Sequence, residues 1–158
     1  MIDKIFGTFV SGRAAWGLLV VRIIFGLGIA QHGWGKIQQP FNWMGPETPI
    51  PGWLQALAAL SEFGGGIALI LGLLAPLALF GLSITMIVAI TTVHLKAGHP
   101  FVTRGDGPSY EVAALYLAAS LLVLIAGPGR FSLDAILFGQ SSSERRKKET
   151  ISRIQERY

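Results

Sequence analysis

The chain has 158 residues, of which 51% are hydrophobic and only 14% are charged, whereas a soluble domain carries about 25% charged residues. This composition and a mean hydropathy of +0.54 argue against a soluble enzyme, a disordered chain or a free nucleic-acid-binding protein. The net charge of +4 is therefore expected in loops and tails that face anionic lipid. With no cysteine, this chain alone holds no disulfide, thiolate metal site or iron–sulfur cluster.

The first 13 residues predict an amphipathic helix that lies on the inner membrane surface. Apolar residues recur there at helical spacing, immediately before the first long apolar stretch: Ile2, Ile5, Phe6, Phe9 and Val10. A basic flank before an apolar stretch also occurs in signal peptides. Arg22 inside that stretch and the lack of a small-residue cleavage site argue against this alternative.

Four apolar stretches are each expected to cross the membrane as a helix, which needs about 20 residues. They cover residues 14–33, 54–73, 76–95 and 110–126. The short connection at 71–76 makes neighbouring helices antiparallel. We therefore predict an all-α fold, an integral membrane up-down four-helix bundle, in a domain spanning residues 14–138.

The segment after the fourth apolar stretch predicts a second interfacial helix, at residues 130–138. Residues 139–158 form a basic tail, interpreted either as a solvated end or as a contact for anionic lipid or a partner.

Lysine and arginine predict the orientation, because they are enriched in cytoplasmic loops. Three of these residues lie in the segments that follow the first and the third apolar stretches, namely Lys36, Lys96 and Arg104. Nine lie on the side shared by both termini: Lys4, Arg13, Arg130, Arg145, Arg146, Lys147, Lys148, Arg153 and Arg157. Both termini are therefore expected in the cytoplasm, and segments 34–53 and 96–109 are expected to face outward.

Two charged residues, Arg22 and Glu62, lie inside apolar stretches, where charges usually pair or line a pathway. Each lies eight residues, or about 12 Å, from the start of its predicted helix. Because these depths overlap, we expect an Arg22–Glu62 salt bridge. Such a pair either fixes the helix register or belongs to a functional pocket.

Other polar side chains gather at the outward ends of the predicted helices. They are Gln31, His32, Lys36, His94 and Glu111. Their convergence in one layer predicts a site. The segment 34–53 before the second helix is rich in aromatic residues and proline. It is either an aromatic belt at headgroup level or a stiff apolar lid over the polar layer.

The chain resembles the DoxX family of small four-span membrane proteins over residues 17–134. The resemblance is carried by LVVRIIFGLGIAQHGWGK in the first stretch and ALSEFGGGIALILGLLAPLA in the second. It continues through MIVAITTVHLKAGHPF and GPSYEVAALYLAASLLVLIAGPGRFSLD, with Glu111 at the family's glycine–aromatic–glutamate position, which here is Ser109-Tyr110-Glu111.

The resemblance implies a quinone-facing subunit of a membrane oxidoreductase, with a protein partner or a second copy in the membrane and no nucleic acid. Arg22, Gln31, His32 and Lys36 would then bind the quinone. His94 would join Arg22 and His32 in donating hydrogen bonds, and Glu62 or Glu111 would move protons. A non-enzymatic scaffold or assembly factor for a membrane protein is the alternative. Haem ligation by His32 and His94 is the weakest hypothesis.

Overall fold

The computed structural model describes residues 9–139, 151–152 and 155, and this part of the chain contains helices and no strand. The helices of the membrane region are, in chain order, α2 (Arg13–Gln38), α3 (Gly52–Leu71), α4 (Ala75–Val88), the π-helix η1 (Ala89–His94) and α5 (Glu111–Ala126). Three helical stretches are long and apolar enough to cross a membrane: α2, α3, and α4 continued by η1. Helix α5 is apolar but shorter, with 16 residues. The all-helical membrane fold is therefore confirmed.

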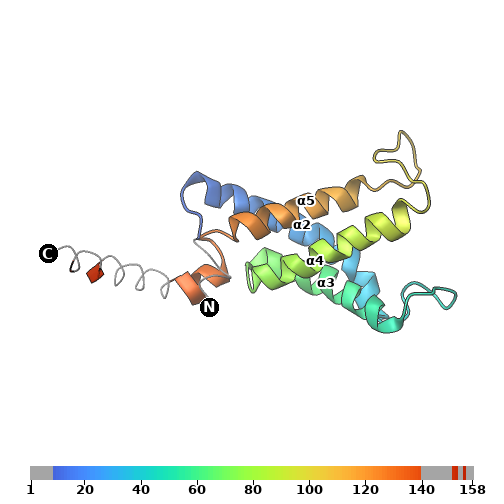
Figure 1. Ribbon diagram of the computed structural model, residues 1–158, viewed down its shortest axis with the longest axis horizontal. Coiled ribbons are helices and arrows are strands. Elements are labelled where there is room, and N and C mark those ends of the chain that lie inside the picture. Colours follow the sequence, from blue (N-terminus) through green and yellow to red (C-terminus); the bar gives the residue numbers. More distant parts are fainter. Residues whose placement is uncertain (1–8, 140–150, 153–154, 156–158) are drawn as a thin grey trace.

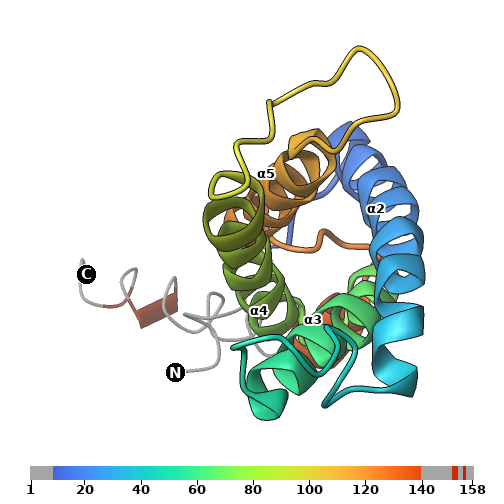
Figure 2. The same ribbon diagram turned by 90° about the vertical axis from the view of Figure 1, so that its right-hand side faces the viewer.

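The helices lie side by side in the order α2, α3, α4 and α5, and α5 returns to contact α2 (Figures 1 and 2). Two clusters of buried side chains fill the space between them. One contains Leu18, Leu69, Ala75, Leu79 and Val123, and the other contains Ile29, Leu82 and Met86. Large apolar side chains such as Leu77 and Ile125 point outward. An apolar outer surface is what a lipid environment favours.

Helices α2 and α3 approach closely because glycines leave room for the facing backbone. A Cβ atom on Gly66 would lie 2.7 Å from the amide nitrogen of Ala30 and 2.8 Å from the carbonyl oxygen of Gly26. Gly33 lies directly against the backbone of Glu62 and Phe63. Small residues permit this approach in membrane helices. Helix α2 continues to Gln38 rather than ending at Gly33, so Lys36 lies on the helix beside Glu62.

The connection between α3 and α4 is as short as predicted. Helix α3 ends at Leu71 and is capped by Gly72, whose φ of 63° lies in the left-handed region that glycine tolerates. Pro76 lies in the first turn of α4, where a backbone N–H would have no partner within the helix. We call this region, together with residues 128–134 packed against it, the turn end of the molecule.

The predicted Arg22–Glu62 salt bridge is wrong. Arg22 is 1% exposed and donates four hydrogen bonds to backbone oxygens at the turn end. Its partners are Leu69 (2.9 Å), Ile70 (2.9 Å), Pro128 (2.7 Å) and Phe131 (2.8 Å). The last carbonyls of a helix have no partner within it, and α3 presents two of them to the guanidinium. Glu62 lies seven residues, about 10 Å, before Leu69 on α3.

A second buried charge, Asp134, completes the turn end. Its two carboxylate oxygens accept hydrogen bonds from the amides of Leu74 (2.7 Å) and Ala75 (2.8 Å), where α4 begins. Its own amide donates to the carbonyl of Gly72 (2.9 Å). Asp134 therefore caps α4 from a segment that follows α5 in the chain.

The two interfacial segments are described in part. Residues 1–8 and most of the tail at 139–158 lie outside the described residues. Residues 9–12 are not helical, and the carbonyl of Val10 accepts a hydrogen bond from the amide of Arg130 (2.9 Å). Residues 133–139 are helical, with Ile136 and Leu137 exposed and Asp134 buried. Contact of this amphipathic helix with lipid stays a prediction.

Candidate ligand-binding site

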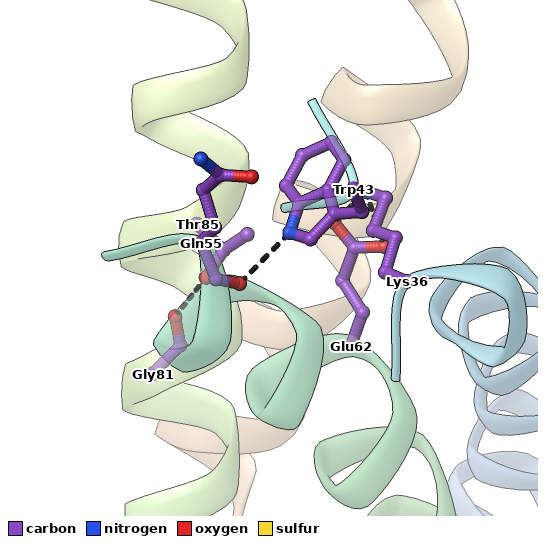
Figure 3. Close-up of polar contacts among 6 residues, drawn as sticks. All are labelled: Lys36, Trp43, Gln55, Glu62, Gly81 and Thr85. Carbon is purple, nitrogen blue, oxygen red and sulfur yellow. Dashed lines mark hydrogen bonds and ion pairs between the residues drawn. The ribbon is translucent and has the colours of Figure 1, made fainter. Parts of the chain in front are cut away.

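The ion pair inside the membrane region joins Lys36 of α2 and Glu62 of α3. The ammonium nitrogen of Lys36 lies 2.6 Å and 2.7 Å from the two carboxylate oxygens of Glu62 (Figure 3). The side chain of Glu62 is 5% exposed, and that of Lys36 is 26% exposed. A buried carboxylate requires such a partner. Lys36 remains partly open to its surroundings.

An aromatic side chain covers this pair. The ring centroid of Trp43 lies 4.5 Å from the Lys36 nitrogen, close enough for a cation–π interaction. Figure 3 shows Trp43 beside Lys36 and Glu62, with its indole N–H pointing to the carbonyl of Gln55 (2.9 Å). Trp43 belongs to the aromatic loop, which we define as residues 39–51 between α2 and α3.

Buried Gln55 holds the aromatic loop in place. Its side-chain amide donates to the carbonyl of Ile50 (2.9 Å), and its side-chain oxygen accepts from the amide of Met44 (3.0 Å). These contacts favour the lid interpretation for this part of the loop. By contrast, Phe41 and Trp53 are more than half exposed, as residues of an aromatic belt would be.

A cavity of about 240 Å³ lies beside the ion pair. Residues from α2, α3, α4, η1, the segment before α5 and α5 itself line it: Ile29, His32, Lys36, Glu62, Met86, Ala89, His94, Ser109, Val112, Ala113 and Tyr116. Five of these residues are aliphatic or Met, and six carry a polar group. A small cavity with apolar walls and convergent polar groups is the usual form of a small-molecule site. We call this half of the molecule the cavity end.

The two cavity histidines have different neighbours. The His32 ring meets the Tyr116 ring edge to face, with centroids 5.7 Å apart. His94 ends η1, and its Nδ1 atom lies 3.1 Å from Nδ1 of His99. Short π-helical turns occur frequently at functional sites, because they displace the side chains that follow.

The structure brings together four of the seven residues proposed from the sequence: His32, Lys36, Glu62 and His94 line the same cavity. Arg22 lies at the turn end instead. Gln31 is exposed and does not line the cavity. Glu111 begins α5, one residue before the cavity residue Val112, but does not itself line the cavity. Their catalytic and binding roles stay predictions.

Sequence reasoning missed three polar contributors to this end. Tyr116 faces the cavity two turns into a helix with little amphipathic pattern, so nothing marked it as inward-facing. Ser109 precedes α5 in a segment without regular structure. Gln55 is a buried polar residue near the start of an apolar helix, and that position was a signal that could have identified it.

Comparisons with known proteins identify the family of this chain and a relative that is a membrane protein. A family model described as DoxX matches residues 17–95, which include α3, α4, η1 and nearly all of α2. The chain belongs to the DoxX family. It is also 33% identical to the inner membrane protein YqjF of Escherichia coli (strain K12) over 129 residues, which cover 77% of this chain and 92% of that protein. No solved structure matches this chain.

The family match includes the ion pair and most of the cavity. Lys36, Glu62 and His94 all lie within residues 17–95, whereas Tyr116 lies beyond them. This DoxX-family chain is therefore a membrane protein whose polar cavity is built largely from the part that the family model describes.

Proposed function

We propose that this DoxX-family protein is a membrane subunit of a quinone-linked redox system and binds a quinone, or a similar small apolar molecule, in the cavity. The observation that carries the proposal is the buried Lys36–Glu62 pair in the wall of a cavity whose other walls are partly apolar. Intramembrane charges beside a cavity usually mark a ligand or ion pathway.

The cavity fits the chemistry of a quinone head group. Its volume of about 240 Å³ lies below the roughly 300–1,000 Å³ of sites for drug-sized ligands. It therefore suits a single substituted ring, with any long apolar tail left among the lipid-facing helices. Ile29, Met86 and Val112 offer apolar contact to such a ring. His32, His94 and Lys36 offer hydrogen bonds to its oxygens.

A bound quinone supplies the redox chemistry, because it takes up and releases electrons together with protons. The protein's own residues bind and orient it and hold protons. Lys36 would hold a quinone oxygen and would stabilise negative charge that grows on it. Glu62, hydrogen-bonded to Lys36, is the carboxylate available to accept or return a proton. Trp43 reduces the access of water to the pair.

The proposal includes the topology. We propose that the protein lies in an inner membrane and that α5 also crosses, which completes an up-down four-helix bundle. Helix α5 is about 24 Å long at 1.5 Å per residue, and it packs between α4 and α2. The basic residues then place both termini in the cytoplasm and the cavity end outward. A Cys at position 43 should be labelled from outside, and labelling only from the cytoplasmic side contradicts this topology.

The function is tested on purified protein in detergent. Organic extraction should release a quinone, and added decylubiquinone should bind. The double variant Lys36→Met/Glu62→Gln removes both charges together, so neither is left buried and unpaired. We expect at least about tenfold weaker binding, equivalent to one lost hydrogen bond of about 1.4 kcal/mol. The matched control is Lys96→Gln, which removes an exposed charge outside the cavity.

Three other outcomes would overturn the quinone proposal. Equal binding by the double variant and the wild type would place the ligand elsewhere. A colourless, ligand-free preparation that co-purifies with one membrane protein would favour the scaffold. A visible absorption band lost in His32→Gln and His94→Gln would favour haem.

A further inference from the structure

Two histidines meet at the edge of the cavity. His94 lines the cavity, and His99 lies five residues later in the segment between η1 and α5. Their Nδ1 atoms are 3.1 Å apart, their ring centroids are 5.3 Å apart, and both side chains are half-buried. The backbone fixes this arrangement, because the amide of His99 donates to the carbonyl of His94 (3.0 Å).

A hydrogen bond between two ring nitrogens requires that one Nδ1 atom carries a proton and the other does not. When both rings are neutral, the donor ring has a bare Nε2 atom and the acceptor ring has a protonated Nε2 atom. One end of the pair can therefore accept a proton while the other end can give one away. With His99 as the donor, protons move from His99 toward His94, and with His94 as the donor they move in the opposite direction.

We propose that His94 and His99 form a proton relay between the outer surface and the cavity, a role that rests on the proposed function because it serves a ligand that exchanges protons. With His99 as the donor, a proton carried by solvent as hydronium adds to Nε2 of His99. The Nδ1 proton of His99 then moves to Nδ1 of His94, and the Nε2 proton of His94 passes into the cavity. One proton enters and one leaves, so the charge of the pair is unchanged. Exchange of the tautomers in both rings restores the starting state.

The surroundings suit each end of this relay. The residues around His99 are exposed on both sides, from Lys96 to Gly98 and at Pro100, so water has access to this segment. At the cavity end, the titratable groups that share the cavity with His94 are His32 and Lys36 of α2, Glu62 of α3 and Tyr116 of α5. The ammonium of Lys36 has no lone pair to accept a proton. The carboxylate of Glu62 and the ring of His32 are therefore the protein groups that can take the proton.

The π-helical turn gives His94 its position. The amides of Leu95 and His99 each donate to a carbonyl five residues earlier, on Ile90 and His94 (2.9 and 3.0 Å). Such wide turns displace the following side chains from their α-helical positions. The segment therefore presents His94 to the cavity and His99 to His94.

The relay is tested without any quinone, on full-length protein labelled with ¹⁵N-histidine in detergent. A scalar coupling between the two Nδ1 nuclei should be visible, because it is transmitted through the hydrogen bond. Exchange of the His94 ring proton with solvent is the functional readout. His99→Gln keeps a side chain able to hydrogen-bond Nδ1 of His94 but cannot pass a proton on. We expect this exchange to slow by roughly a hundredfold, the lower limit for a positioned proton donor. Lys96→Gln, in the same exposed segment, should leave it unchanged.

Two outcomes would overturn the proposal. Absence of the Nδ1–Nδ1 coupling in the wild type means that the pair is not formed. Unchanged exchange in folded His99→Gln means that protons reach His94 by another route. Neither outcome bears on decylubiquinone binding, so a failure of the relay is distinguished from a failure of the quinone site.

Discussion

The two ends of the molecule both bury charged side chains, but they use them differently. At the turn end, Arg22 and Asp134 bind backbone groups that the helices and turns leave without partners. At the cavity end, Lys36 and Glu62 bind each other, beside a cavity of about 240 Å³. Arg22 and Asp134 are at most 1% exposed, whereas Lys36 is 26% exposed.

This difference teaches how to separate structural from functional charges in a membrane protein. Arg22 donates from four of its five N–H groups to backbone carbonyls and does not line the cavity, and its removal would take a donor from each of those carbonyls. An ammonium that shares one carboxylate and faces a cavity retains hydrogen-bonding capacity. Burial of charge alone would rank Arg22 first as a site residue. Its partners instead assign it to stability.

The sharpest test of this contrast is Arg22→Leu. Four backbone carbonyls would each lose a donor, and at about 1 kcal/mol each we expect a loss of about 4 kcal/mol in the free energy of unfolding. Chemical unfolding in detergent measures it. Arg13→Gln is the matched control, since Arg13 is exposed on the same helix, and its effect should stay within about 0.5 kcal/mol. A loss below about 1 kcal/mol for Arg22→Leu contradicts the structural assignment.

The second prediction concerns Asp134 at the same end. Asp134→Ala removes the acceptor for two amides at the start of α4, and we expect a loss of about 2 kcal/mol, the upper range for a helix cap. Asp134→Asn keeps one side-chain oxygen and should lose about half as much. Both variants, once folded, should bind decylubiquinone as the wild type does. A selective loss of binding would mean that the two ends are coupled.

At the cavity end, a double-mutant cycle on Lys36→Met and Glu62→Gln should give a coupling energy of about 1–2 kcal/mol, within the range for residues in direct contact. A parallel cycle on Arg22→Leu and Glu62→Gln should be additive within about 0.5 kcal/mol, because these side chains have no shared partner. Unfolding in detergent supplies all the values. The reverse ranking of the two cycles would restore the pairing expected from the sequence.

Much of the fold follows from the sequence because lipid imposes a simple rule. Long apolar stretches become helices, so each predicted stretch corresponds to an observed helical one, and Pro76 marks the start of α4 correctly. The Arg22 partners could not be predicted in this way. They are backbone carbonyls, which have no sequence signature, and two of them, on Pro128 and Phe131, are more than 100 residues away.

Part of the candidate site could also be predicted from the sequence, because the order of the helices determines which helix ends meet. Alternating helix directions bring polar helix ends into one layer, and this places His32, Lys36 and His94 correctly together. Which side chains then face the cavity depends on helix rotation. Glu111 and Val112 are neighbours, and it is Val112 that lines the cavity. Helix α5 has almost no amphipathic pattern, so its rotation could not be derived from the sequence.

The smallest effect is expected at the aromatic loop, which is joined to Gln55 by hydrogen bonds between side chains and backbone groups. Trp43→Phe keeps an aromatic ring over Lys36 but removes the N–H that binds the carbonyl of Gln55. A net hydrogen bond contributes about 1 kcal/mol, so unfolding in detergent should show a loss near that value. Trp53→Phe is the matched control, because Trp53 is 61% exposed, and it should change little.

The affinity for decylubiquinone tests whether Trp43 also limits the access of water to the Lys36–Glu62 pair. Trp43→Phe should alter the affinity less than Trp43→Ala, because only the alanine variant removes the ring from the Lys36–Glu62 pair and admits water to it. Equal affinity in the wild type and Trp43→Ala would show that the loop anchors α2 to α3 without closing the site. The aromatic loop would then belong, like the turn end, to the structural part of the molecule.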